Sequence, residues 1–138
     1  ASSLVAAYNE DILKGLLQLE RNPPEQREAI QHFDAVDPDL VGAHCGIGMA
    51  YIFDQTKPCF GLKHDPKSQR YKVSGRATGR LVDAGVNLAH ALRDAASEHG
   101  GNGGGHPIAA GCAFPEENKE AFLATLDEIV EDQLHGQG

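Results

Sequence analysis

The stretch Gly100–Gly111 constrains this chain most, because five of the six residues 100–105 are glycine and His106 and Pro107 follow them. Glycine loses more backbone freedom on ordering than any other residue, so such a run is unfavourable in a helix or a packed strand. A flexible linker is the alternative, but one histidine followed by small apolar residues is unusual in a linker. We therefore expect a binding loop whose successive N–H groups form an anion site, with His106 as a further donor.

Composition limits the partners of this chain. Its 138 residues suffice for one domain with a core. A net charge of −8 argues against a broad basic surface, so any nucleic-acid contact must depend on a few concentrated groups. The three cysteines form no CxxC pair and are expected to be small buried residues in a reducing compartment. Without a membrane-length apolar run or a signal-peptide pattern, we expect a cytoplasmic protein with no membrane partner.

Apolar spacing predicts helices and strands in a mixed order. The predicted helices cover residues 3–20, a short segment from Pro24, about 39–53, 86–98 with Asn87 as its cap, and 115–134. The predicted strands cover residues 59–62, 69–77 and 109–114, with a turn at 63–67. This order indicates an α/β fold: a small mixed sheet with helices packed on it, preceded by an N-terminal helical segment.

We divide the chain into a helical connector or docking segment, residues 1–36, and a binding domain, residues 37–138. The connection between the strands at 69–77 and 109–114 is long enough for a crossover, so parallel pairing of the two is compatible with the sequence.

The strand at 69–77 carries the candidate binding chemistry. Its period of two puts Lys72, Ser74 and Arg76 on one face, and Thr78 follows the strand. Arg76 can hold a phosphate bidentately, which a lysine cannot do. The alternatives are that Lys72 is an ordinary solvated lysine and that His106 is a buried structural histidine. The candidate phosphate-binding residues are Lys72, Ser74, Arg76, Thr78, Gly103, Gly104, Gly105 and His106.

No catalytic set and no metal site is predicted in this chain. It has no nucleophile elbow, Walker loop or zinc spacing, and its histidines do not cluster with carboxylates at metal-binding spacings. The sequence therefore indicates a binding domain.

Four segments together resemble a known family: residues 71–78 (YKVSGRAT), 85–89 (GVNLA), 103–106 (GGGH) and 109–111 (AAG). In this order and spacing they resemble the DHHA1 domain, the C-terminal substrate-binding domain of DHH-family phosphoesterases. The resemblance covers residues 40–134 and is most specific for archaeal RecJ-like single-strand exonucleases.

The resemblance implies that a separate N-terminal DHH domain, absent from this chain, holds two metal ions, Mn or Mg. It also implies that the residues at Arg76 and Gly103–His106 hold the end of a single-stranded nucleic acid or short oligonucleotide. The chain lacks the DHH motif and a starting Met. We therefore expect a C-terminal piece of a metal-dependent exonuclease or phosphodiesterase that is inactive alone.

Other members of this class leave further functions open. Related DHH enzymes act on short oligonucleotides or cyclic dinucleotides, and DHHA1-like domains also end alanyl-tRNA synthetases. A RecJ-like relative without activity would instead serve as a scaffold for replication proteins. The sequence upstream of this chain would distinguish an enzyme from a scaffold, because only the enzyme needs its metal-binding aspartates and histidines.

Overall fold

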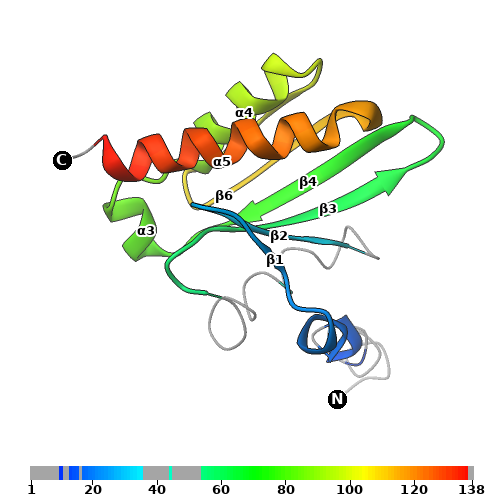
Figure 1. Ribbon diagram of the computed structural model, residues 1–138, viewed down its shortest axis with the longest axis horizontal. Helices are drawn as coiled ribbons and strands as arrows, with labels where there is room; N and C mark the ends of the chain where they lie inside the picture. Colours follow the sequence, from blue (N-terminus) through cyan, green and yellow to red (C-terminus); the bar gives the residue numbers. More distant parts are fainter. Residues whose placement is uncertain (1–9, 11–12, 16, 36–43, 45–53, 137–138) are drawn as a thin grey trace.

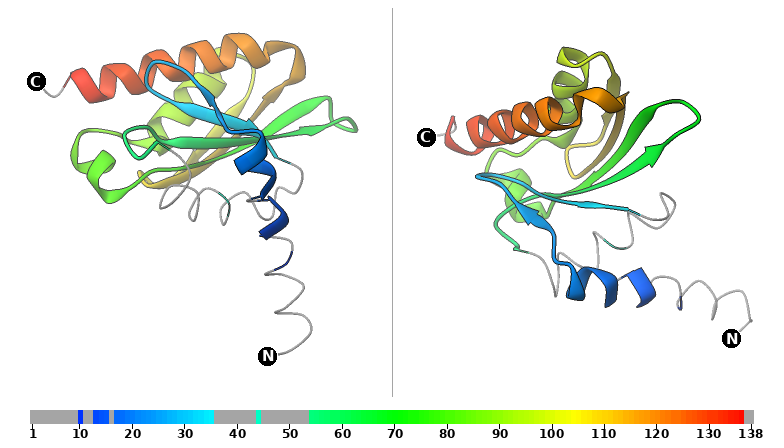
Figure 2. Two further views of the ribbon diagram at one scale, coloured as in Figure 1. Left: turned by 60° about the horizontal axis from the view of Figure 1, so that its bottom comes forward. Right: turned by 45° about the vertical axis from the view of Figure 1, so that its right-hand side comes forward.

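The computed structural model describes residues 10, 13–15, 17–35, 44 and 54–136. In this part of the chain one mixed sheet has the strand order β1-β2-β3-β4-β6-β5. Figures 1 and 2 show helices α4 and α5 on one side of the sheet and the N-terminal helix on the other. The predicted class, a small mixed sheet with helices packed on it, is confirmed.

The elements have the following bounds. The strands are β1 (Glu25–Gln26), β2 (Gln31–Asp34), β3 (Cys59–Asp65), β4 (Arg70–Arg76), β5 (Asn102–Gly105) and β6 (Ala109–Pro115). The helices are α3 (Gly79–Asp83), α4 (Leu88–Glu98) and α5 (Lys119–His135), the last preceded by a 3-10 turn at Glu116–Asn118. The short helix α3 was not expected from the sequence, and β3 extends three residues into the expected turn at 63–67.

The core lies between the sheet and helices α4 and α5. Asn87 caps α4 as predicted, because its side-chain oxygen accepts a hydrogen bond from the His90 N–H at 3.1 Å. The rings of Phe114 and Phe122 stack with centroids 4.1 Å apart, which joins β6 to α5. Other fully buried side chains come from the sheet and both helices: Phe60, Leu62, Leu88, Leu92, Leu126 and Val130.

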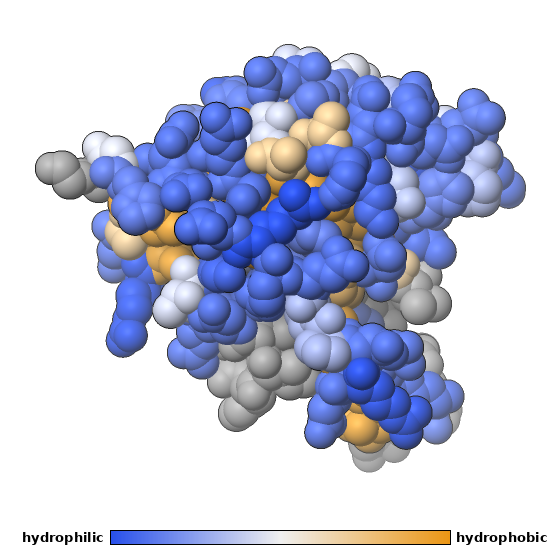
Figure 3. Space-filling model, in the orientation of Figure 1, coloured by the Kyte–Doolittle hydropathy of each residue, from blue (hydrophilic) through white to orange (hydrophobic). Residues whose placement is uncertain are grey.

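The outer surface of α5 and the β1–β2 side is mostly hydrophilic, with hydrophobic side chains in small patches (Figure 3). Among the described residues, no helix is long and apolar enough to cross a membrane.

The N-terminal region differs in part from the prediction. The described residues between 10 and 21 are helical, and the helix ends before Pro23 as expected. The short helix expected from Pro24 is wrong, because β1 and β2 form an antiparallel hairpin and β2 pairs in parallel with β3. Phe33 is buried within β2 and Ile30 is buried in the turn just before it, so both apolar side chains belong to this hairpin. The helix expected at 39–53 lies outside the described residues, apart from His44, and the domain division at residue 36 stays a prediction.

The strands β4 and β6 pair in antiparallel fashion over all seven residues, from Arg70 opposite Pro115 to Arg76 opposite Ala109. The parallel pairing considered for these segments is wrong. The chain crosses over through α4 into β5, which runs in the direction of β4 at the sheet edge. A tight turn then reverses the chain, so that β6 lies between β4 and β5 and runs opposite to both.

The glycine-rich segment expected as a loop is the edge strand β5, so that prediction is wrong. Its glycines let the strand approach β6 very closely. A Cβ at Gly103 would lie 2.4 Å from the Cys112 Cβ, and one at Gly101 would lie 1.9 Å from the Ala113 oxygen. Gly105 adopts φ +145°, a conformation that favours glycine. The glycines of this segment therefore permit close approach to the neighbouring strand.

Candidate functional site

The polar residues of β4 lie on the face of the sheet opposite α4 and α5. Val73 is buried, and a Cβ at Gly75 would meet Phe60 and Leu88, so odd-numbered β4 residues face the core. Since side chains alternate along a strand, Lys72, Ser74 and Arg76 share the other face, as predicted. We call this surface of β4, β6 and β5 the open face.

Arg76 and His106 lie in one row across the open face. Arg76 is opposite Ala109 on β6. On the other side of Ala109, the His106 N–H donates to the Ala109 oxygen at 2.9 Å, and the Ala109 N–H donates to the His106 oxygen at 3.2 Å. Pro107 and Ile108 form the two-residue turn between them, a position where proline sets φ favourably. With strands about 4.8 Å apart, the Cα atoms of Arg76 and His106 are roughly 10 Å apart.

The His106 side chain is exposed, so the alternative of a buried structural histidine is wrong. The Arg76 side chain is half-buried, and its Nη1 donates to the Gly75 oxygen at 2.7 Å. No carboxylate of the described residues lies within 4.0 Å of the Arg76 guanidinium. Because a guanidinium has five N–H donors, Arg76 retains donors for an anion.

The next row of the open face consists of Ser74, Gly111 and Gly104. A Cβ at Gly104 would have no atom of the described residues within 4 Å, so this position opens outward. Gly103 and Gly105 belong to the opposite face, where the lack of a side chain lets β5 pack closely against β6. Of the three glycines in the predicted site, Gly104 is thus the one that shares a face with Ser74 and Arg76.

Of the other predicted residues, Thr78 has a structural contact and Lys72 lies farther along β4. The hydroxyl of Thr78 caps α3 by accepting from the Leu81 N–H at 3.1 Å. Lys72 is exposed four residues before Arg76 on β4, a separation of about 13 Å. Lys72 lies opposite Lys63 on β3. Lys63 was not among the predicted site residues, because the sequence pattern predicted a turn at 63–67 where β3 continues.

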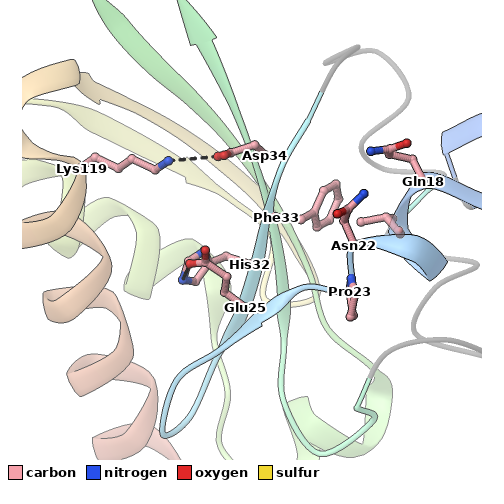
Figure 4. A pocket seen from close by; sticks show the side chains of 9 residues that line it. Gln18, Asn22, Pro23, Glu25, His32, Phe33, Asp34 and Lys119 are labelled. Carbon is pink, nitrogen blue, oxygen red and sulfur yellow. Dashed lines mark hydrogen bonds and ion pairs between the residues drawn. The ribbon is translucent and has the colours of Figure 1, made fainter.

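The hollows lined by described residues include a groove and a pocket. A groove of about 530 Å³ beside α3 is lined by Gln55, Thr56, Thr78, Arg80, Leu81 and Ala84. A pocket of about 280 Å³ lies at the opposite edge of the sheet, between β1, β2 and the N-terminal helix (Figure 4). Its charged side chains contact one another: Lys119 donates to Asp34 at 3.0 Å, and the buried His32 accepts from Arg27 Nε at 3.1 Å. Burial and the nearby Arg27 lower the pKa of His32.

Within the described residues, no group of three or more His, Cys, Asp or Glu side chains could hold a metal ion. Cys59 is buried, and burial raises the pKa of Cys112 to about 12. The thiolate is the reactive form of cysteine, so Cys112 is a packing residue. The open face therefore offers binding groups, and the described part of the chain offers no metal centre.

The fold defines a small α/β domain with a glycine-rich edge strand. Residues 47–132, more than half of the chain, match the model of the DHHA1 domain. The chain belongs to the DHHA1 domain family. The uncharacterized protein MJ0831 of Methanocaldococcus jannaschii is 37% identical over 86 residues, which are 62% of this chain and 19% of that protein. The chain thus spans about a fifth of the length of this relative.

Solved structures share the fold at low identity. PggH of Vibrio cholerae, a pGpG-specific phosphodiesterase, has a TM-score of 0.66 and 14% identity over 94% of this chain and 42% of that chain. RecJ of Thermus thermophilus in complex with Mn²⁺ has a TM-score of 0.63 and 21% identity over 91% and 17%. The C-Ala domain of Aquifex aeolicus alanyl-tRNA synthetase has a TM-score of 0.57 and 16% identity over 80% and 97%. At these identities the similarity concerns the fold.

Proposed function

We propose that this chain is the substrate-binding domain of a DHH-family phosphoesterase and holds a phosphate at the end of a single-stranded nucleic acid. The observation that carries this proposal is the row of Arg76, Ala109 and His106. The row places a guanidinium without a carboxylate partner among the described residues, a methyl group and an exposed imidazole side by side on the open face.

Each residue has a separate part in this binding. Arg76 donates two parallel hydrogen bonds to phosphate oxygens, and His106 donates a third from its ring. Ser74 adds a hydroxyl donor, and the lack of a side chain at Gly104 lets the ligand approach the sheet. The domain positions the phosphate, and the hydrolysis belongs to a DHH domain with Mn or Mg that would accompany it. The likeness to RecJ solved with Mn²⁺ supports this division of labour.

A second candidate is binding of a dinucleotide. The fold likeness to a pGpG-specific phosphodiesterase favours it, and the same row of residues would hold the phosphate of a dinucleotide. The two candidates differ in how much of the open face the ligand covers.

Chemical-shift mapping at low salt tests the proposal, with single strands that carry either a terminal phosphate or a terminal hydroxyl. The phosphorylated strand should bind more tightly and shift the amide signals of Arg76, His106 and Gly104. Equal affinity for the two strands, or shifts confined to the α4 and α5 side, would contradict the proposed site.

A further inference from the structure

Two lysines face each other on the open side of β3 and β4. Lys63 is directly opposite Lys72, and Lys72 is exposed while Lys63 is half-buried. Like charges directly opposite on neighbouring strands repel each other. No carboxylate of the described residues lies within 4.0 Å of either ammonium. The pair therefore concentrates positive charge that an anionic ligand would neutralise.

Within the described β3–β4 hairpin one acid, Asp65, lies on this face; its carboxylate is attracted to Lys72 and is held by hydrogen bonds near the β3–β4 turn. The Asp65 carboxylate accepts from the Ser68 hydroxyl at 3.0 Å and from the Lys67 N–H at 3.1 Å. Lys63, Arg70, Lys72 and Arg76 all lie on this face of the β3–β4 hairpin. These are four of the twelve lysine and arginine residues of the chain. This face of the hairpin therefore gathers positive charge, although the net charge of the chain is −8.

The spacing along β4 limits what can contact both ends of this surface. Lys72 and Arg76 are separated by four strand residues, or about 13 Å. Adjacent phosphates of one nucleic-acid strand lie closer together than that, so the two positions suit phosphates with another phosphate between them. Between the two positions, the β4 residue on this face is the half-buried Ser74. Its side chain is small, so it does not obstruct a nucleic-acid strand that lies along β4.

We propose that Lys63 and Lys72 form a second phosphate subsite, so that a single strand runs along β4 from the Arg76–His106 row toward the β3–β4 turn. The domain thereby selects strands of three or more nucleotides over dinucleotides. This inference rests on the proposed function, because it takes the Arg76–His106 row as the subsite for the terminal phosphate.

The test compares two thymidine ligands, each with one terminal phosphate at the same end: a dinucleotide, which has two phosphates in all, and a twelve-nucleotide strand. Affinities are measured at several low salt concentrations for the wild type, the double variant Lys63→Ala/Lys72→Ala, Arg76→Ala and Arg93→Ala. Arg93 is an exposed cation on α4, which covers the other face of the sheet, so Arg93→Ala is the control for loss of a cation away from the proposed path. Melting curves establish that each variant is folded.

We expect the wild type to bind the longer strand at least about tenfold more tightly than the dinucleotide, and the double variant to bring this ratio to within about twofold. With one phosphate held at each of the two subsites, the slope of log K against log salt for the longer strand should be about −1.4, and the double variant should reduce its magnitude by about 0.7. Arg93→Ala should leave the ratio as in the wild type.

Two outcomes separate this inference from the proposed function. If Arg76→Ala weakens both ligands while the double variant keeps the wild-type ratio, the second subsite is wrong and the terminal phosphate site stands. If Arg76→Ala changes neither affinity, the proposed function itself is wrong. A wild type that binds both ligands equally also contradicts the second subsite.

Discussion

Arg76 and His106, far apart in the sequence, flank Ala109 from opposite sides in one row of the sheet. In the register of the described strands, the methyl group of Ala109 lies between them on the open face. At a Cα separation of roughly 10 Å, both side chains are long enough to donate hydrogen bonds to one tetrahedral anion. The row thus brings two hydrogen-bond donors, the Arg76 guanidinium and the His106 imidazole, to adjoining antiparallel segments of the sheet.

Arg76→Ala should weaken binding of a phosphorylated strand about tenfold to a hundredfold. The change removes charge-assisted hydrogen bonds, which typically contribute ~1.5–3 kcal/mol. Arg76→Lys should give an intermediate loss, since lysine keeps the charge without the bidentate geometry. Affinity is measured beside melting temperature. An Arg76→Ala protein with wild-type affinity, or with a lowered melting temperature as its sole defect, would make Arg76 a structural residue.

Substitutions at Gly104 and Gly105 should separate binding from stability. Gly104→Val should leave the fold nearly as stable as the wild type, because its Cβ would meet no described atom within 4 Å, and should weaken strand binding by blocking the approach to the sheet. Gly105→Ala should destabilise the fold by about 1–3 kcal/mol, since φ is +145° and its Cβ would lie 2.7 Å from the Ala110 Cα. Urea unfolding and strand affinity are measured for both. The reverse order of the two stabilities would contradict this account of β5.

Adding Mn²⁺ to this chain alone should release no nucleotide from a single strand. Two-metal hydrolysis needs grouped carboxylate and imidazole ligands, and the described residues hold no such group. Product release is measured with a labelled strand against a buffer blank and against the Arg76→Ala variant purified in parallel. Release that needs Mn²⁺ and is lost in Arg76→Ala would show that this chain has a catalytic centre of its own.

Lowering the pH below 6.5 should destabilise the fold through His32. Its pKa is lowered from 6.5 in the folded state, first by burial and then by Arg27, so the unfolded chain binds more protons in this range. The contribution of neutral His32 is complete above pH 6.5 and is lost as the pH falls through the folded-state pKa. Asp54 and Asp65, whose pKa values lie below 3.8, titrate outside this window.

The measurement for His32 is the free energy of unfolding in urea at pH 7.5 and 5.5. His32→Gln should show a smaller loss on acidification than the wild type, while His90→Gln, at an exposed position on α4, should behave as the wild type does. The same pH dependence in the wild type and His32→Gln would rule out the buried histidine as the cause.

The sequence by itself determined the elements whose signals are local. The cap at Asn87, the apolar stripe of α5 and the alternation along β4 each depend on residues a few positions apart. The alternation also identified Lys72, Ser74 and Arg76 as one face, and the segments that resemble DHHA1 domains indicated the family that the comparison with its model shows.

The tertiary structure decided what depends on pairing between distant segments. Glycines have little intrinsic preference for a strand, so β5 follows from its close approach to β6, which the sequence around residues 100–105 does not encode. The hairpin of β1 and β2 is fixed likewise by the parallel pairing of β2 with β3. The row of Arg76 with His106 and the pair of Lys63 with Lys72 are set by register, because a shift of one residue would turn each side chain to the opposite face.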